Sequence, residues 1–280
     1  MITGMPRIAI AVTDFASTVD TFRRCFGMPV VDASASTVAS LGVHVGMCVP
    51  EGGSNIELMS PVEASSPLGR SLQGFLDRRG EGLFALMLEA ADPDAEAVEL
   101  AARGLDVLPL MPGAAGRDIH PRSTHGVLVR VYPTNSFTER SDDPIGQPEI
   151  AGIARVIIAV HDAEEAARPY TEGFALDSTP PEVDTDRGVV SVVCRPPTGG
   201  VIELVSPHDA SRPFAGRIQQ FLDEGQEGMF ALVLQTENPE AAAGALAAAG
   251  VSVDRADGVE ASVFGTRLMI ETTSMAANRS

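Results

Sequence analysis

Hydrophobic residues in the first quarter of the chain follow two periods, and each period predicts a different element. Residues 7–12, RIAIAV, alternate and are rich in β-branched side chains, which indicates a strand. Asp14 comes next, and apolar residues then recur at positions 15, 19, 22 and 26, so we expect a helix that Asp14 caps. Short strands are expected within residues 39–49 and 55–59.

The second quarter follows the same plan. Residues 83–90, LFALMLEA, predict a buried strand, and residues 92–104 predict a helix. Strands are expected at 105–110 and 126–132. This helix should begin at the N-cap Asp92, with Pro93 at its first position, and end at Gly104. In the last quarter, Asn238, Pro239 and Gly250 give the same three signals. The pattern predicts an α+β chain of four βαβββ modules.

The two halves of the chain repeat each other. SNIELMSP at 54–61 matches GVIELVSP at 200–207, and PRIAIAVTD at 6–14 matches ARVIIAVHD at 154–162. A period this long indicates two domains rather than a solenoid. We therefore expect domains at 1–137 and 150–272, a polar, Pro- and Ser-containing linker at 138–149 and a flexible tail at 273–280.

Composition and charge limit the kinds of partner that the protein is expected to bind. The 280 residues carry a net charge of −18, which disfavours nucleic acid and anionic membranes, because both bind clustered Lys and Arg. No apolar run reaches 18 residues, and the first residues do not resemble a signal peptide. The three cysteines have no CxxC spacing, which favours reduced thiols and a cytoplasmic protein.

Several stretches resemble the vicinal oxygen chelate superfamily, which includes glyoxalase I, bleomycin-resistance proteins and extradiol dioxygenases. They are the paired modules, GEGLFAL at 80–86, IELMSP at 56–61 and IHPRSTHGVLVRV at 119–131. The most similar pattern is that of methylmalonyl-CoA epimerase. The resemblance implies two cup-shaped domains of mixed sheet with outer helices. In metal-using members, strands of two modules hold one divalent ion in the cup.

The resemblance also places the metal-ligand positions. In the first half, the first-strand histidine position falls on Arg7 and the following glutamine or glutamate position on Glu57. The second histidine position falls on Ala85, and the final glutamate position falls on Arg130. Arginine has no acceptor and stays protonated, so it cannot ligate a cation.

In the second half the same positions fall on Arg155, Glu203 and Ala231. The last falls on Met269, with Glu271 two residues further on the same face. One carboxylate beside a fixed positive charge does not hold a divalent ion that needs three or more ligands. We therefore expect both cups to be metal-free and the protein to use no cofactor.

A strand sends alternate residues to one face, so Arg7, Ala9 and Ala11 should line the first cup. A buried charge needs a partner, which predicts an Arg7–Glu57 ion pair and an Arg155–Glu203 twin. These pairs could brace the cups internally. Alternatively, Arg130 adds a second cation to the first cup, which would then seat a small anionic carboxylate or acyl-thioester substrate.

That alternative predicts an isomerase, epimerase or lyase in which Arg7 or Arg130 stabilises an oxyanion and Glu57 is the base. The candidate substrate-binding residues are Arg155, Glu203, Ala85, His125 and Met269, with His125 at the rim of the first cup.

Two other functions remain open. A metal-free cup could sequester a small molecule, as the bleomycin-resistance resemblance implies, although the chain has no Trp and two Tyr. Phe84 and Phe230 adjoin the alanine positions but should face the helices, away from the cup. One or both cups could instead be vestigial, in a pseudo-two-fold monomer or a homodimer.

Overall fold

Two mixed β-sheets, one from each half of the chain, form the protein. The computed structural model describes residues 1–35, 41–225 and 227–273. The first sheet has the strand order β2-β3-β4-β1-β5-β7-β6. Its strands are β1 (Ile2–Ala11), β2 (Val30–Asp32), β3 (Val43–Cys48), β4 (Asn55–Pro61), β5 (Gly82–Ala90), β6 (Arg117–Ile119) and β7 (Val129–Pro133). Both modules of the first half therefore share one sheet, joined where β1 and β5 pair antiparallel.

The second sheet repeats this topology in the order β10-β11-β12-β8-β13-β16-β15-β14, with β9 paired to β11. Its strands are β8 (Ile153–Ala159), β9 (Asp177–Ser178), β10 (Glu182–Asp184), β11 (Val189–Arg195), β12 (Val201–Pro207), β13 (Gly228–Thr236), β14 (Ser252–Asp254), β15 (Val259–Val263) and β16 (Thr266–Thr272). The strands β1–β7 and β8–β16 define the first and second domains. The tail expected at 273–280 lies almost wholly outside the described residues.

Among the described residues, six α-helices accompany the sheets: α1 (Phe15–Arg24), α2 (Pro67–Arg79), α3 (Pro93–Ala102), α4 (Ala163–Arg168), α5 (Pro213–Asp223) and α6 (Pro239–Ala248). The predicted N-caps are confirmed, because the side chains of Asp14, Asp92 and Asn238 accept hydrogen bonds from first-turn N–H groups. No helix in the described part of the chain is long and apolar enough to span a membrane.

One predicted strand is reduced to a single bridge. In the stretch 105–110, only Val107 pairs with the sheet, opposite Ile119. Pro109 has no N–H to donate to a ladder, and Leu110 is 53% exposed, so the segment cannot continue as a strand. The predicted strand within 39–49 begins at Val43, and residues 39 and 40 lie outside the described part.

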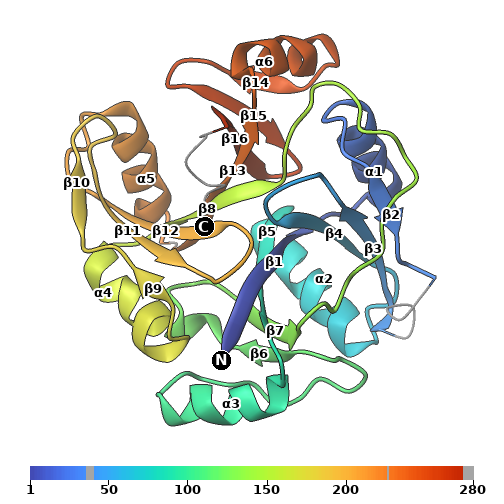
Figure 1. Cartoon of the computed structure of the whole chain (residues 1–280), viewed down its shortest axis with the longest axis vertical. Helices are drawn as coiled ribbons and strands as arrows, with labels where there is room; N and C mark the ends of the chain where they lie inside the picture. The colour runs from blue at the N-terminus through green and yellow to red at the C-terminus, as the bar shows by residue number, and fades with distance from the viewer. Residues whose placement is uncertain (36–40, 226, 274–280) are drawn as a thin grey trace.

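In the part of the chain that the structure describes, three apolar clusters hold the fold together. The largest runs through both domains without interruption and includes residues of α1, α3, α4 and α6 together with one face of each sheet. Figure 1 shows these four helices at the periphery, around the central strands β1, β5, β8 and β13. The opposite face of each sheet, here called the cup face, carries a separate cluster beneath α2 in the first domain and α5 in the second.

A β-bulge changes the expected orientation of two phenylalanines. Ala9 pairs with Ala85 and Ile10 pairs with Leu83, so Phe84 is an extra residue in β5. Phe84 and Ala85 consequently share the cup-face cluster, although simple alternation predicted opposite faces. Phe230 and Ala231 repeat this arrangement in β13. Phe84 packs edge-on against Phe75 of α2, and Phe230 packs edge-on against Phe214 and Phe221 of α5. Phe84 and Phe230 are therefore core residues.

The two domains meet through backbone contacts that are equivalent by the repeat. A Cβ atom added to Gly126 would collide with the carbonyl of Glu227, and one added to Gly265 would collide with the carbonyl of Glu81. Both glycines have positive φ, at 80° and 63°. The halves therefore interlock as two copies of one surface around a pseudo-two-fold axis.

Candidate functional site

Arg7 and Glu57 meet on the cup face of the first domain. Glu57 on β4 pairs with Ala9 of β1, two residues from Arg7 on the same face. Arg7 Nε lies 2.9 Å from Glu57 Oε2, and the two side chains are only 6% and 7% exposed. The predicted ion pair is confirmed, and its burial makes each charge dependent on the other.

Arg7 has two further neighbours from the end of the first domain. Its Nη1 donates to Ser136 Oγ at 3.0 Å, and its guanidinium lies 4.7 Å from the centre of the Tyr132 ring. A guanidinium over an aromatic face gains a cation–π attraction. Arg7 is therefore oriented by a carboxylate, a hydroxyl and a ring.

Arg130 lies in the same row of the sheet, but it has its own carboxylate. Arg7 pairs with Met87, Met87 pairs with Arg130, and Arg130 pairs with Asp118 across successive strands. Arg130 Nε lies 3.2 Å from Asp118 Oδ1, and its side chain is 3% exposed. The expected surplus of positive charge is thus wrong, because Asp118 balances Arg130 as Glu57 balances Arg7.

Burial would by itself lower the pKa of Arg130. Asp118, followed by Tyr132 and Glu57, outweighs burial and raises the pKa of Arg130 above its ordinary value. Burial also raises the pKa of the Tyr132 hydroxyl. Both groups keep their protons at neutral pH, so Tyr132 is a neutral donor or acceptor there.

A cavity of about 410 Å³ opens over the Arg7–Glu57 pair. Apolar side chains line much of it, and the segment 136–139 closes one side: the lining includes Leu41, Val45, Met47, Tyr132, Ser136 and Phe137. This volume and mixture of surfaces suit a small organic molecule. Ala85, a candidate substrate-binding residue, is fully buried in the cluster beneath α2 and is not among the lining residues.

The donor set does not fit a divalent metal ion. In residues 1–35, 41–225 and 227–273, no group of three or more His, Cys, Asp or Glu side chains is arranged to hold one. Glu57 is the carboxylate at the expected ligand positions, with Arg7 beside it and Ala85 on the neighbouring strand. A cation there would face a guanidinium in place of a ligand.

The second domain carries a denser ionic network at the equivalent place. Glu203 Oε2 lies 2.8 Å from Arg155 Nε, which confirms the predicted twin pair. Glu203 Oε1 lies 2.5 Å from Arg187 Nη2 and accepts a hydrogen bond from Ser191 Oγ at 3.0 Å. Arg155 also contacts Glu271, at 2.6 Å. Glu203 is 2% exposed and is held from several sides, which favours an internal brace over a binding group.

Met269 takes the place of Arg130 in the second domain, since Val233 pairs with both Arg155 and Met269. It is 9% exposed and packs in the apolar cluster beneath α5. Glu260, which pairs with Met269, instead has Arg217 and Arg267 at 3.7 Å. The two cup faces have therefore diverged in charge.

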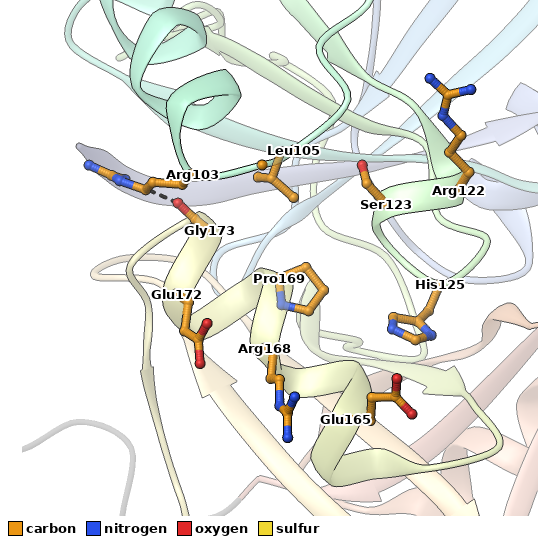
Figure 2. Close-up of a pocket in the computed structure, with 11 residues that line it drawn as sticks. Arg103, Leu105, Arg122, Ser123, His125, Glu165, Arg168, Pro169, Glu172 and Gly173 are labelled. Atoms are coloured by element: carbon orange, nitrogen blue, oxygen red, sulfur yellow. Dashed lines mark hydrogen bonds between the residues drawn. The ribbon is translucent and has the colours of Figure 1, made fainter.

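His125 lies at the domain boundary and not at the rim of the first cup. Its Nδ1 is 2.9 Å from Glu227 Oε2 of the second domain. It borders a cavity of about 360 Å³ between the domains. Figure 2 shows Arg103 and Arg122 pointing away from the space between Leu105 and His125. Arg168 shares the lining with Glu165 and Glu172, so the boundary cavity does not focus positive charge. His125 joins the domains instead.

Sequence reasoning missed Asp118, Ser136 and Arg187. Asp118 lies in a three-residue strand, too short to show a period, and Ser136 lies in a polar stretch typical of a linker. A buried charge needs a partner, which indicates that Arg130 has one but does not identify it as Asp118.

Comparisons with known proteins agree with this fold. Residues 7–120 and 152–263 each match a family model described as Glyoxalase/Bleomycin resistance protein/Dioxygenase superfamily. No curated protein matches the chain.

Similar solved structures include a triple mutant of 4-hydroxymandelate synthase from Streptomyces coelicolor. It has 14% identity and a TM-score of 0.66 over 97% of this chain and 92% of its own. A xylose isomerase-like TIM barrel/4-hydroxyphenylpyruvate dioxygenase fusion protein has 14% identity and a TM-score of 0.62 over 97% of this chain and 48% of its own. A variant of Streptomyces coelicolor methylmalonyl-CoA epimerase in complex with 2-nitronate-propionyl-CoA has 26% identity and a TM-score of 0.40, over 47% of this chain and 96% of its own. The first two show the same fold across both domains.

Proposed function

The chain belongs to the Glyoxalase/Bleomycin resistance protein/Dioxygenase superfamily, and on that premise we propose that its first cup is a metal-independent active site. The reaction is an isomerisation, epimerisation or lyase step at a carbon next to a carbonyl of a small molecule. Arg7 stabilises the oxygen on which charge develops, and Glu57 moves the proton. The second cup braces its own domain.

The Arg7–Glu57 pair on the cavity wall carries this proposal. It places an N–H donor group and a carboxylate side by side in a largely apolar space. A guanidinium has five N–H donors, and Glu57 and Ser136 accept from two different nitrogens of Arg7 among the described residues. A substrate oxygen can therefore share Arg7 with Glu57.

The proposed step balances within the pair. A Glu57 oxygen takes a proton from the carbon beside the carbonyl, and the C–H electron pair forms the enolate. An Arg7 N–H donates to the enolate oxygen, which is more basic than the carbonyl it replaces. Return of the proton from Glu57 to another carbon of the delocalised enolate completes an isomerisation and restores Glu57. Epimerisation requires the enolate to turn its opposite face toward Glu57 before the same proton returns.

Other candidates take supporting roles in this proposal. Arg130 is engaged by Asp118, so it fixes the row of the sheet beside Arg7 and does not touch the substrate. Arg155, Glu203 and Met269 stabilise the second domain.

Deuterium wash-in tests the proposal. Small carboxylic acids and acyl thioesters are incubated with the protein in heavy water, and exchange at the carbon beside the carbonyl is followed by NMR. Glu57→Gln should abolish exchange, whereas the matched Glu203→Gln variant should retain it if it folds. Addition of EDTA should leave the rate unchanged. Exchange that persists in Glu57→Gln would remove Glu57 as the base.

A binding function is the second candidate, and the contact between Glu57 and Arg7 favours it. The positive charge of Arg7 beside the carboxylate weakens Glu57 as a base, which disfavours proton abstraction and leaves binding unaffected. The aromatic residues Tyr132 and Phe137 also line the cavity and suit sequestration of an apolar ligand. A compound that raises the melting temperature and is recovered unchanged, with no deuterium incorporated, would support sequestration over catalysis.

A further inference from the structure

The chain between the two domains remains in contact with the first domain. In Figure 1 it runs from β7 across the first domain and past α1 before it enters β8. We call residues 134–146 the strap. Ser136 accepts a hydrogen bond from Arg7 at one end. At the other end, Asp143 lies 2.8 Å from Arg23, and the Gly146 N–H donates to the Gly27 carbonyl at 2.9 Å.

The middle of the strap has a cavity on each side. Phe137, Thr138 and Glu139 line the first-cup cavity together with Arg7 and Glu57. The same three residues line a second cavity of about 460 Å³, here called the outer cavity. The strap is therefore the shared wall of two spaces and is not packed against a continuous surface.

The outer cavity continues the cup face beneath the strap. Met47 of β3 lines the first cavity, and Val49, one residue beyond the end of β3, lines the outer one. On the neighbouring strand, Glu57 lines the first cavity and Asn55, two residues earlier, lines the outer one. Residues two apart in a strand share a face and are separated by about 7 Å. The floor of the outer cavity is thus the next row of the same sheet.

The outer cavity is acidic. Glu51 and Glu139 line it together with Arg140, and Asp143, also in the lining, is paired with Arg23. The apolar part of the lining consists of Pro29, Val49, Pro50, Phe137 and Ile145. Phosphate groups would be repelled at such a surface. An uncharged chain would instead bury apolar area there.

We propose that the ligand of the first cup is elongated, with a carbonyl head at the Arg7–Glu57 pair and an uncharged tail beneath the strap in the outer cavity. This inference rests on the proposed function of the first cup. It deepens that function by naming the substrate class: a medium-chain keto or acyl compound without a phosphorylated tail.

Binding of a chain-length pair tests the inference. The full-length protein is labelled with ¹³C in the methionine methyl groups, and the Met47 signal, assigned from its loss in Met47→Leu, reports occupancy of the first cavity. Pyruvate and α-ketooctanoate are titrated separately. Each buried methylene tightens binding about fourfold, so burial of about three methylenes in the tail gives α-ketooctanoate roughly 50-fold higher affinity.

Two variants fill the outer cavity from opposite sides. Val49→Trp acts from the sheet, and Ile145→Trp acts from the strap, where Ile145 is 40% exposed and tolerates substitution. Each should weaken α-ketooctanoate about tenfold or more and leave pyruvate within about twofold. Val183→Trp, at a 47% exposed position in the second domain, is the matched control and should change neither affinity.

The outcomes separate the two proposals. If pyruvate and α-ketooctanoate bind equally, or if the outer-cavity variants leave α-ketooctanoate unchanged, the elongated ligand is refuted and the first cup stands. If octanoyl-coenzyme A binds more tightly than α-ketooctanoate, the uncharged tail is refuted. If neither acid moves the Met47 signal at millimolar concentration, the proposed site for carbonyl compounds fails and the inference falls with it.

Discussion

Removal of one partner from the buried Arg7–Glu57 pair should cost more stability than removal of both. Arg7→Met removes the guanidinium that is paired with Glu57 and leaves a carboxylate whose side chain is only 7% exposed. Loss of one member of a buried pair costs about 3–5 kcal/mol, whereas replacement of both by apolar residues is close to neutral. We therefore expect Arg7→Met and Glu57→Leu each to lose about 3–5 kcal/mol. The double variant should lose less than about 2 kcal/mol.

Urea unfolding of the wild type, both single variants and the double variant measures this coupling. The second domain provides a contrast, because Glu203 keeps Arg187 and Ser191 when Arg155 is replaced. Arg155→Met should thus cost at least about 1 kcal/mol less than Arg7→Met. A double variant whose loss equals the sum of the single losses would refute the pairing. An Arg155→Met loss as large as that of Arg7→Met would refute the contrast between the cups.

Three further outcomes follow from the structure. Gly126→Ala should lose about 2–4 kcal/mol of unfolding free energy, because residue 126 has positive φ and its new Cβ would collide with the Glu227 carbonyl. Gly104→Ala also has positive φ, but its Cβ would meet open space, so it should lose only about 1 kcal/mol. Burial raises the pKa of Tyr132 and Tyr170 above the usual 10, so the stability they confer is present below pH 10 and is lost as pH rises above it. Ultraviolet titration should show phenolate only with unfolding, and a reversible native titration at pH 10 would contradict this. Zn²⁺, Mn²⁺ or Co²⁺ should leave the melting temperature unchanged, whereas a tight site at 100-fold excess over its Kd would add about 2.7 kcal/mol.

The tandem repeat and the strand periods were sufficient to place the first cup. The resemblance placed Arg7 and Glu57 at positions that face the cup, and alternation along β1 assigned the residues that share this face, so the Arg7–Glu57 pair could be predicted. Asp118 could not be predicted, because its partnership with Arg130 depends on a three-residue strand at the sheet edge. The face of the sheet on which Phe84 lies depends on a β-bulge, which adds one residue to β5 and shifts the alternation of its side chains.

The strap was also beyond the sequence pattern. Its polar and proline-containing residues are typical of a linker, and period and composition do not show that Ser136 reaches Arg7. Contacts of this kind join segments far apart in the chain, so they depend on tertiary structure and not on local preference.

The shared core and the interlocked glycine contacts restrict how the first cup can open. Rotation of one half against the other would separate apolar surface along the whole boundary and drive Gly126 and Gly265 against backbone that already lies in contact with them. Rotation of the domains against each other is therefore opposed, and a ligand that binds the first cup would pass the strap, which an exposed Arg23–Asp143 pair holds at its far end. The rate of ligand entry should therefore rise with ionic strength, because salt screens the Arg23–Asp143 pair, and substitutions at the domain boundary should not change it.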